Sequence, residues 1–269
     1  MADRDYVLGT EEEEIERLGL QHRVWRERML AAFARGGIGA GATVIDVGCG
    51  PGYASVDLAE IVGPQGRVLA FERSRRFLES LAERAARAGL SSITATERDV
   101  AEEPLGDAVA DAAWCRWVLS FVADPARTVA HVARALKPSG VAIFHEYVDY
   151  GAWRTMPPSA EVDRFRTLVM KSWRDSAGEP DAALYLPAHL AAAGMEVIEA
   201  RPLAEIVRRG DFTWEWPRAF MGVNAHRLRD LGYVDAEEAE RLAGALDALP
   251  ETTLMITPIV AEVIARKPG

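Results

Sequence analysis

Hydrophobic and polar residues alternate along the first 150 positions between two patterns, one typical of buried strands and one typical of amphipathic helices. Short runs of β-branched and other apolar residues predict strands at 44–47, 67–71, 93–96, 110–118 and 141–147. Between these runs, apolar residues recur at helical spacing and predict helices at 55–62, 77–88 and 125–136. Strands that alternate with helices in this way predict an α/β fold with a doubly wound, mostly parallel sheet.

The chain ahead of the first strand has the pattern of a single long helix. Thr10 and Glu13 have the spacing of a capping box, which satisfies exposed backbone N–H groups at a helix start. Apolar residues then recur at helical spacing until Gly36-Gly37. We therefore expect residues 1–36 to form a helical leader segment in front of the sheet.

The regular alternation ends after residue 150. The pattern beyond it predicts helices at 159–176, 187–193 and 212–249, and two long strands at 195–207 and 253–265. Helices placed before and between the last two strands predict a helical cap beside the sheet. The predicted organisation is a leader at 1–36, a core at 37–150, a cap insertion at 151–186, and the end of the sheet at 187–269 with a second insertion at about 210–250.

Composition and charge limit which kinds of protein this chain can be and which partners it can bind. The chain has 269 residues, a formal net charge of −10 and 49% hydrophobic residues, which together suit one globular protein and disfavour nucleic acid as a partner. Cys49 and Cys115 lie in a loop and a buried strand, where reduced thiols are expected. Because neither a signal region nor a membrane span is apparent, we expect a cytoplasmic protein that does not enter the membrane.

The most informative segment is the apolar run at 44–47 and the glycines that follow it. Glycines at Gly48, Gly50 and Gly52 predict a tight turn that opens a helix, with backbone N–H groups directed at a ligand. A dinucleotide loop of the form Gly-x-Gly-x-x-Gly requires glycine at the position of Tyr53. The spacing found here therefore disfavours NAD(P), although a NAD(P)-dependent oxidoreductase remains one alternative.

An acidic residue, Asp46, stands two positions before the first glycine. This arrangement resembles the S-adenosylmethionine (SAM) loop of class I SAM-dependent methyltransferases of the bacterial small-molecule type. Two later segments support the resemblance. Residues 116–125 resemble the pattern RWVLxHxxDP, with Phe121 where histidine is common, and residues 135–140 resemble the turn LKPGG, with Ser139 replacing one glycine. The similarity covers residues 40 to 147.

The resemblance implies a Rossmann-like seven-stranded, mostly parallel sheet with an antiparallel final strand, and one cofactor contact at each of several strand ends. Asp46 is expected at the methionine end of SAM, and Glu72 is expected to accept both ribose hydroxyls. Arg73 is expected to cover the adenine, whose amino group and ring nitrogen are expected at Asp99 and the N–H of Val100. S-adenosylhomocysteine (SAH) is the expected product.

The leader segment is also similar to the leader of a bacterial methyltransferase subgroup, in which it closes over SAM. Tyr6 and Gln21 are the implied contacts. The complete set of predicted cofactor residues is Tyr6, Gln21, Asp46, Gly48, Gly50, Gly52, Glu72, Arg73, Asp99, Val100, Arg116 and Trp117.

Methyl transfer from a sulfonium needs an aligned acceptor, and needs a general base only when the acceptor is a hydroxyl or a protonated amine. Candidate catalytic residues are His145, Glu146 and Tyr147 at the end of the fifth strand, although the favoured interpretation of His145 is a side chain packed beside the sheet and hydrogen-bonded to the backbone. Asp149 breaks the His-Glu-x-x-His pattern of a metal site, so no metal is predicted.

The predicted cap is rich in aromatic residues, which favours an apolar or aromatic small-molecule acceptor. Arg174, His226 and Arg227 are candidates for binding an acidic acceptor or are surface residues. We therefore predict O-methylation, with N- or C-methylation open, by a monomer or homodimer. The alternative to an oxidoreductase or a methyltransferase is a SAM-binding protein that does not methylate, such as a pseudoenzyme, a regulator or a cyclase.

Overall fold

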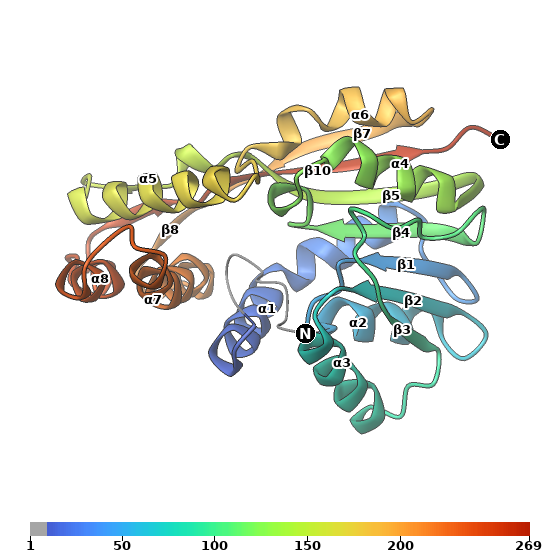
Figure 1. The fold of residues 1–269 in the computed structure, drawn as a ribbon, viewed down its shortest axis with the longest axis horizontal. Coiled ribbons are helices and arrows are strands. Elements are labelled where there is room, and N and C mark those ends of the chain that lie inside the picture. The colour runs from blue at the N-terminus through green and yellow to red at the C-terminus, as the bar shows by residue number, and fades with distance from the viewer. Residues whose placement is uncertain (1–9) are drawn as a thin grey trace.

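The computed structural model describes residues 10–269 (Figure 1). Its main feature is a seven-stranded sheet with the order β3-β2-β1-β4-β5-β10-β7, in which β10 runs antiparallel to both of its neighbours and the other neighbouring pairs are parallel. The strands are β1 (Thr43–Val47), β2 (Arg67–Glu72), β3 (Ile93–Glu97), β4 (Ala110–Arg116), β5 (Leu136–Asp149), β7 (Glu196–Leu203) and β10 (Ile259–Arg266). The predicted fold and the antiparallel final strand are confirmed.

Helices cover both faces of this sheet. They are α1 (Glu12–Arg35), α2 (Tyr53–Val62), α3 (Arg75–Arg87), α4 (Pro125–Ala135) and α6 (Leu186–Ala192). Trp114 of β4 packs with apolar side chains of α1 and α2, whereas its neighbour Cys115 packs with those of α4 and α6. Since adjacent strand residues point to opposite faces, this pair shows why β4 is apolar and buried from Ala112 to Cys115.

The start of α1 differs from the prediction. Glu11 occupies the N-cap position and makes no side-chain capping hydrogen bond. The helix thus begins one residue later than the predicted capping box of Thr10 and Glu13 requires. Glu14 in the first turn is buried and forms an ion pair with Arg17. The first turn of the helix therefore contributes a buried charged group and is not wholly exposed to solvent.

The two predicted long strands are each broken in two. The region 195–207 forms β7 and β8 (Ile206–Arg208), and the region 253–265 forms β9 (Leu254–Ile256) and β10. Pro258 lies in the second break, where it has no N–H to donate to a ladder. The two breaks lie together, because the N–H of Thr257 donates to the carbonyl of Glu205 at 3.0 Å.

The separated strands build a second, three-stranded sheet of order β6-β9-β8, with β6 at Arg154–Met156. Helices α5 (Ala160–Asp175), α7 (Glu215–Asp230) and α8 (Ala236–Ala243) gather beside it as the cap, at the left of Figure 1, with α1 between the cap and the main sheet. The predicted helix at 212–249 is therefore two helices, interrupted at Gly232, which has a φ of 81°. Within residues 10–269, no helix is long and apolar enough to cross a membrane.

Candidate functional site

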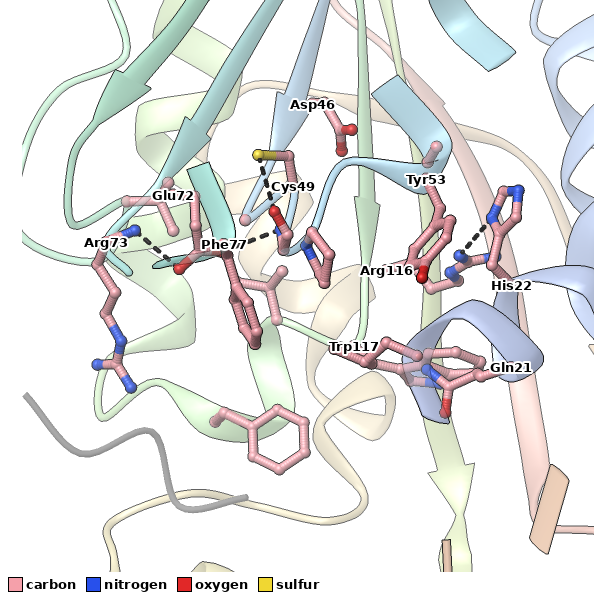
Figure 2. A pocket seen from close by; sticks show the side chains of 18 of the residues that line it. Gln21, His22, Asp46, Cys49, Tyr53, Glu72, Arg73, Phe77, Arg116 and Trp117 are labelled. Atoms are coloured by element: carbon pink, nitrogen blue, oxygen red, sulfur yellow. Dashed lines mark hydrogen bonds between the residues drawn. The ribbon is translucent and has the colours of Figure 1, made fainter. Parts of the chain in front are cut away.

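A cavity with about 1170 Å³ of empty space, including the part open to solvent, lies where the carboxyl ends of the central strands meet α1 and the cap (Figure 2). Ligands of open α/β sheets bind at this edge. The predicted cofactor residues that line the cavity are Gln21, Asp46, Gly48, Gly50, Glu72, Arg73, Asp99, Val100, Arg116 and Trp117. Tyr6 lies outside the described residues.

Gly52, the remaining predicted cofactor residue, is not part of the cavity lining. It has a φ of 86°, and a Cβ atom on it would lie 2.3 Å from Cδ1 of Leu81. Gly52 is therefore required by the turn and by packing against α3, and its expected cofactor contact stays a prediction. Gly50 has a φ of 53° and lines the cavity, and nothing lies within 4 Å of the position its Cβ would take, so this glycine leaves space for a ligand.

Glu72 is fixed by backbone donors. Its Oε2 accepts a hydrogen bond from the N–H of Gly50 at 3.0 Å, and its Oε1 accepts from the N–H groups of Arg73 and Ser74 at 2.8 and 2.9 Å. Burial raises the pKa of the Glu72 carboxyl. A carboxylate has about four lone-pair sites, so in this arrangement about one site remains for a ligand hydroxyl rather than the two that were expected.

Asp46 and Asp99 occupy two further strand ends. Asp46 is buried and its Oδ2 accepts a hydrogen bond from the hydroxyl of Ser55 at 2.6 Å. Burial raises the pKa of the Asp46 carboxyl to about 6. Asp99 accepts from the N–H of Ala101 at 3.0 Å, which holds its carboxylate at the rim of the cavity next to Val100.

The turn after β4 brings a cation and a large aromatic ring to the cavity. Burial lowers the pKa of Arg116 to about 10, and its guanidinium lies 5.1 Å from the ring centre of Trp117. Trp117 has a φ of 53°, in the left-handed region that residues with a side chain rarely adopt. Its ring stacks on those of Tyr147 and Trp216, at 5.5 and 5.7 Å between centres and 19° between planes. Such strained residues concentrate at functional sites.

Of the three predicted catalytic residues, only Tyr147 lines the cavity. His145 is fully buried, with Nε2 lying 2.9 Å from Oε2 of Glu262 on β10, and burial lowers its pKa. Glu146 is also fully buried, and its Oε1 accepts hydrogen bonds from the N–H groups of Val118 and Leu119 at 2.8 and 3.0 Å. His145 and Glu146 thus support the sheet and the turn, which corrects their expected place beside the acceptor.

Helix α1 supplies more of the site than predicted. Arg17 binds Glu14 through two hydrogen bonds of 2.7 Å and donates a third to Oε1 of Gln21 at 2.9 Å. The same Gln21 oxygen accepts from the indole N–H of Trp216 on α7 at 3.0 Å. Arg17 and His22 both line the cavity. Polar residues at helical spacing on an otherwise apolar face were the available indication, and His22 was not identified from it.

Some of the predicted aromatic cap residues line the cavity, whereas others are buried inside the cap. Trp173 and Phe220 line the cavity together with Phe121, which stacks edge-on against Trp173 at 4.6 Å. The other cap tryptophans are buried in an aromatic cluster, and Phe212 is 53% exposed. Arg174, His226 and Arg227 are not among the lining residues, and Arg174 pairs with Glu179 at 2.9 Å. Within residues 10–269 there is no group of three or more metal-binding side chains.

Comparison with known proteins agrees with this geometry. A methyltransferase-domain family matches residues 38–178, which is just over half of the chain. The protein belongs to this family, the class I methyltransferases, whose cofactor is SAM.

Two curated relatives show how far the sequence similarity extends. A Trichormus variabilis 2-phytyl-1,4-naphtoquinone methyltransferase is 33% identical over 47% of this chain and 55% of its own length. An uncharacterized 37.1 kDa protein in a Streptomyces fradiae transposon is 34% identical over 47% of this chain and 36% of its own length. The chain thus spans about half or less of these relatives.

Solved structures share the fold. The [4+2]-cyclase SpnF has a TM-score of 0.55 and 24% identity, over 88% of this chain and 78% of that chain. Haemonchus contortus phosphoethanolamine N-methyltransferase 2, in complex with SAH, has a TM-score of 0.58 and 16% identity, over 90% of this chain and 53% of that chain. At these identities the similarity concerns the fold alone, and the reaction has to be argued from the site.

Proposed function

We propose that the protein is an enzyme that transfers the sulfonium methyl group of SAM to a small aromatic or apolar acceptor, first of all to an oxygen atom, with nitrogen or carbon as the other possible acceptor atoms. The observation that carries the proposal is one continuous cavity. Its first part is lined by Asp46, Gly50 and Glu72 at the strand ends, and its second part by aromatic rings such as Tyr147 and Trp173.

The first part of the cavity fits SAM in shape and charge. Gly50 leaves the space that a side chain would fill, and Glu72 offers an acceptor fixed by three backbone donors. Asp46 and Arg116, of opposite charge, complement the ammonium and carboxylate of an amino acid. When bound, SAM supplies an electrophilic methyl group, so the protein's contribution is orientation and exclusion of water.

The second part of the cavity fits a flat, uncharged acceptor. Parallel rings of Trp117, Tyr147 and Trp216 and the edge-on rings around Trp173 favour stacking of a planar ring. The guanidinium of Arg17, which lies 5.3 Å from the ring centre of Phe220, is already paired with Glu14. The name of the Trichormus variabilis relative, 2-phytyl-1,4-naphtoquinone methyltransferase, also refers to an aromatic and apolar compound.

Calorimetric titration of the protein with SAM, SAH, NAD⁺ and NADPH tests the cofactor, with Glu72→Ala compared against Glu97→Ala. Glu97 is a matched control, because it is the exposed partner of Glu72 in the register between β2 and β3. We expect SAM binding that weakens at least tenfold in Glu72→Ala and is unchanged in Glu97→Ala. Binding of NAD(P) without SAM would refute the proposal and favour an oxidoreductase.

The transfer itself is tested with a panel of phenols, quinols and heteroaromatic amines. Mass spectrometry should detect SAH together with an acceptor heavier by one methylene. If SAM binds but no SAH is produced with any acceptor of the panel, the protein binds SAM without methylating. A cyclase or a regulator then replaces the proposal.

A further inference from the structure

A chain of polar side chains runs from exposed Arg26 through buried Asp57 and His22 to Arg116 at the cavity. Arg26 binds the carboxylate of Asp57 on α2 with hydrogen bonds of 2.9 to 3.1 Å. Oδ2 of Asp57 also lies 3.0 Å from Nε2 of His22. On the other side of the ring, Nδ1 of His22 lies 3.4 Å from Nη2 of Arg116. Figure 2 shows His22 and Arg116 side by side at one end of the cavity.

The chemistry of the partners fixes the proton on His22. A guanidinium group has five donors and no acceptor, so Nδ1 of His22 must accept the hydrogen bond from Arg116. The proton is therefore on Nε2, which donates to Asp57. Burial and the charge of Arg116 both lower the pKa of His22 and keep this neutral form. The ring is held further by stacking on Tyr53, at 5.6 Å and 21° between planes.

Arg116 depends on this histidine for its polar contact with the protein. Among residues 10–269, His22 is the one side chain with a nitrogen or oxygen atom in hydrogen-bond reach of its guanidinium, which also lies 3.9 Å from Sδ of Met29. No carboxylate within that range lies within 4.0 Å of Arg116. A half-buried cation of this kind, on the wall of a cavity, is suited to an anionic ligand group.

We propose that Asp57 and His22 are positioning residues that hold Arg116 in place for the carboxylate at the methionine end of the cofactor. The inference rests on SAM as the cofactor, as proposed above. In SAM the carboxylate is the single anionic group, and Arg116 would meet it with the donors that His22 leaves unused. Removing Nδ1 of His22 allows the guanidinium to rotate on its long side chain, and the carboxylate loses a prearranged partner.

Two ligands separate this role from general damage to the site. SAH carries the amino-acid end, whereas 5′-methylthioadenosine shares its adenosine and sulfur and lacks the carboxylate and the ammonium. In His22→Phe the stacking on Tyr53 is kept and the hydrogen bond is lost. We expect the dissociation constant for SAH to rise about tenfold, the effect of one charge-assisted hydrogen bond, while that for 5′-methylthioadenosine changes less than twofold.

Further variants make the assignment specific. His22→Asn keeps an acceptor near the position of Nδ1 and should recover part of the SAH affinity, and Asp57→Ala should give an intermediate loss. In Arg116→Gln the preference for SAH over 5′-methylthioadenosine should disappear, and His22→Phe added to it should have no further effect on that preference. His226→Phe, a partly exposed histidine outside the cavity, is the control and should bind both ligands as the wild type does.

The outcomes are distinguishable. Equal losses for both ligands in His22→Phe and His22→Asn, or an unchanged preference for SAH, overturn the positioning role while leaving the cofactor assignment in place. Additive effects of His22→Phe and Arg116→Gln on the preference overturn it too, because the two residues would then act independently. Failure of the wild type to bind either ligand overturns the proposed function and this inference together.

Discussion

Replacing Glu146 by glutamine should change how the stability of this protein depends on pH. The carboxyl group is completely buried, and it accepts hydrogen bonds from the N–H groups of Val118 and Leu119 in the turn that carries Trp117. Its second oxygen lies 3.5 Å from the hydroxyl of Ser120. Glutamine has nearly the same shape and can keep these contacts, with its amide nitrogen donating to Ser120, but it cannot ionise.

The magnitude follows from the pKa of Glu146, which burial raises from 4.5 to about 7. Between these two values the folded protein holds a proton that the unfolded chain has released, so this group makes stability fall as the pH rises. A shift of this size corresponds to a loss of about 2.5 kcal/mol between pH 5 and pH 8 in the wild type. Glu146→Gln should therefore gain about 2.5 kcal/mol relative to the wild type over that interval.

Urea unfolding at pH 5, 6, 7 and 8, with linear extrapolation to water, measures the difference between the two proteins at each pH. Taking this difference cancels other titrating groups, including Asp46. The same substitution at Glu251, which is exposed, is the control for removing one carboxylate. A constant difference between Glu146→Gln and the wild type, or one that favours the wild type increasingly at high pH, would refute a protonated, buried Glu146.

Two further predictions concern the loop and the acceptor side. Gly52→Ala should lower the free energy of unfolding by about 2 kcal/mol or more, because it combines a left-handed φ with a clash against Leu81. Gly50→Ala should cost less stability and should instead weaken SAH binding. Equal shifts of the melting temperature in the two variants, with SAH binding unchanged, would contradict this difference. If Tyr147 is the general base, Tyr147→Phe, which keeps the ring stacked on Trp117, should lower the turnover of a hydroxyl acceptor about 100-fold and leave the SAH affinity unchanged. Single-turnover kinetics and SAH binding measure the two effects, and full turnover would exclude Tyr147 as the base.

The strand-end residues could be predicted because their position depends on local pattern. Asp46 and Glu72 each follow an apolar run and Asp99 comes shortly after a β-branched one, and parallel strands bring such positions to one edge of the sheet. His145 and Glu146 could not be assigned in this way. Their surroundings come from Glu262, more than a hundred residues later, and from the turn at 118–120, so the strand pattern gave no information about which face was occupied.

The same reason explains why the break in the last two strands was missed. Apolar residues recur along the whole of 195–207 and 253–265, and this pattern does not show that the ends of the two segments belong to a different sheet. Pro258 marks the interruption in the second segment, whereas the proline of the first segment, Pro202, lies within β7 and not at the break. The cap beside this small sheet matters for function, since its helix α7 contacts α1 and contributes Phe220 to the cavity.

Helix α1 connects the two halves of the site. On one side, the hydroxyl of Tyr53 donates to the carbonyl of Ile15 at 3.1 Å, and a Cβ atom on Gly19 would lie 2.4 Å from that hydroxyl, so the helix is fitted closely to the residue that follows the glycine loop. On the other side, Gln21 accepts from Trp216 in the cap. Tyr53 stands where a dinucleotide loop has glycine. A glycine there would remove this hydrogen bond to α1 and also the ring that stacks on His22. Tyr53, whose presence disfavours a dinucleotide loop, therefore also links α1 to the cofactor loop, and α1 in turn contacts the cap through Gln21.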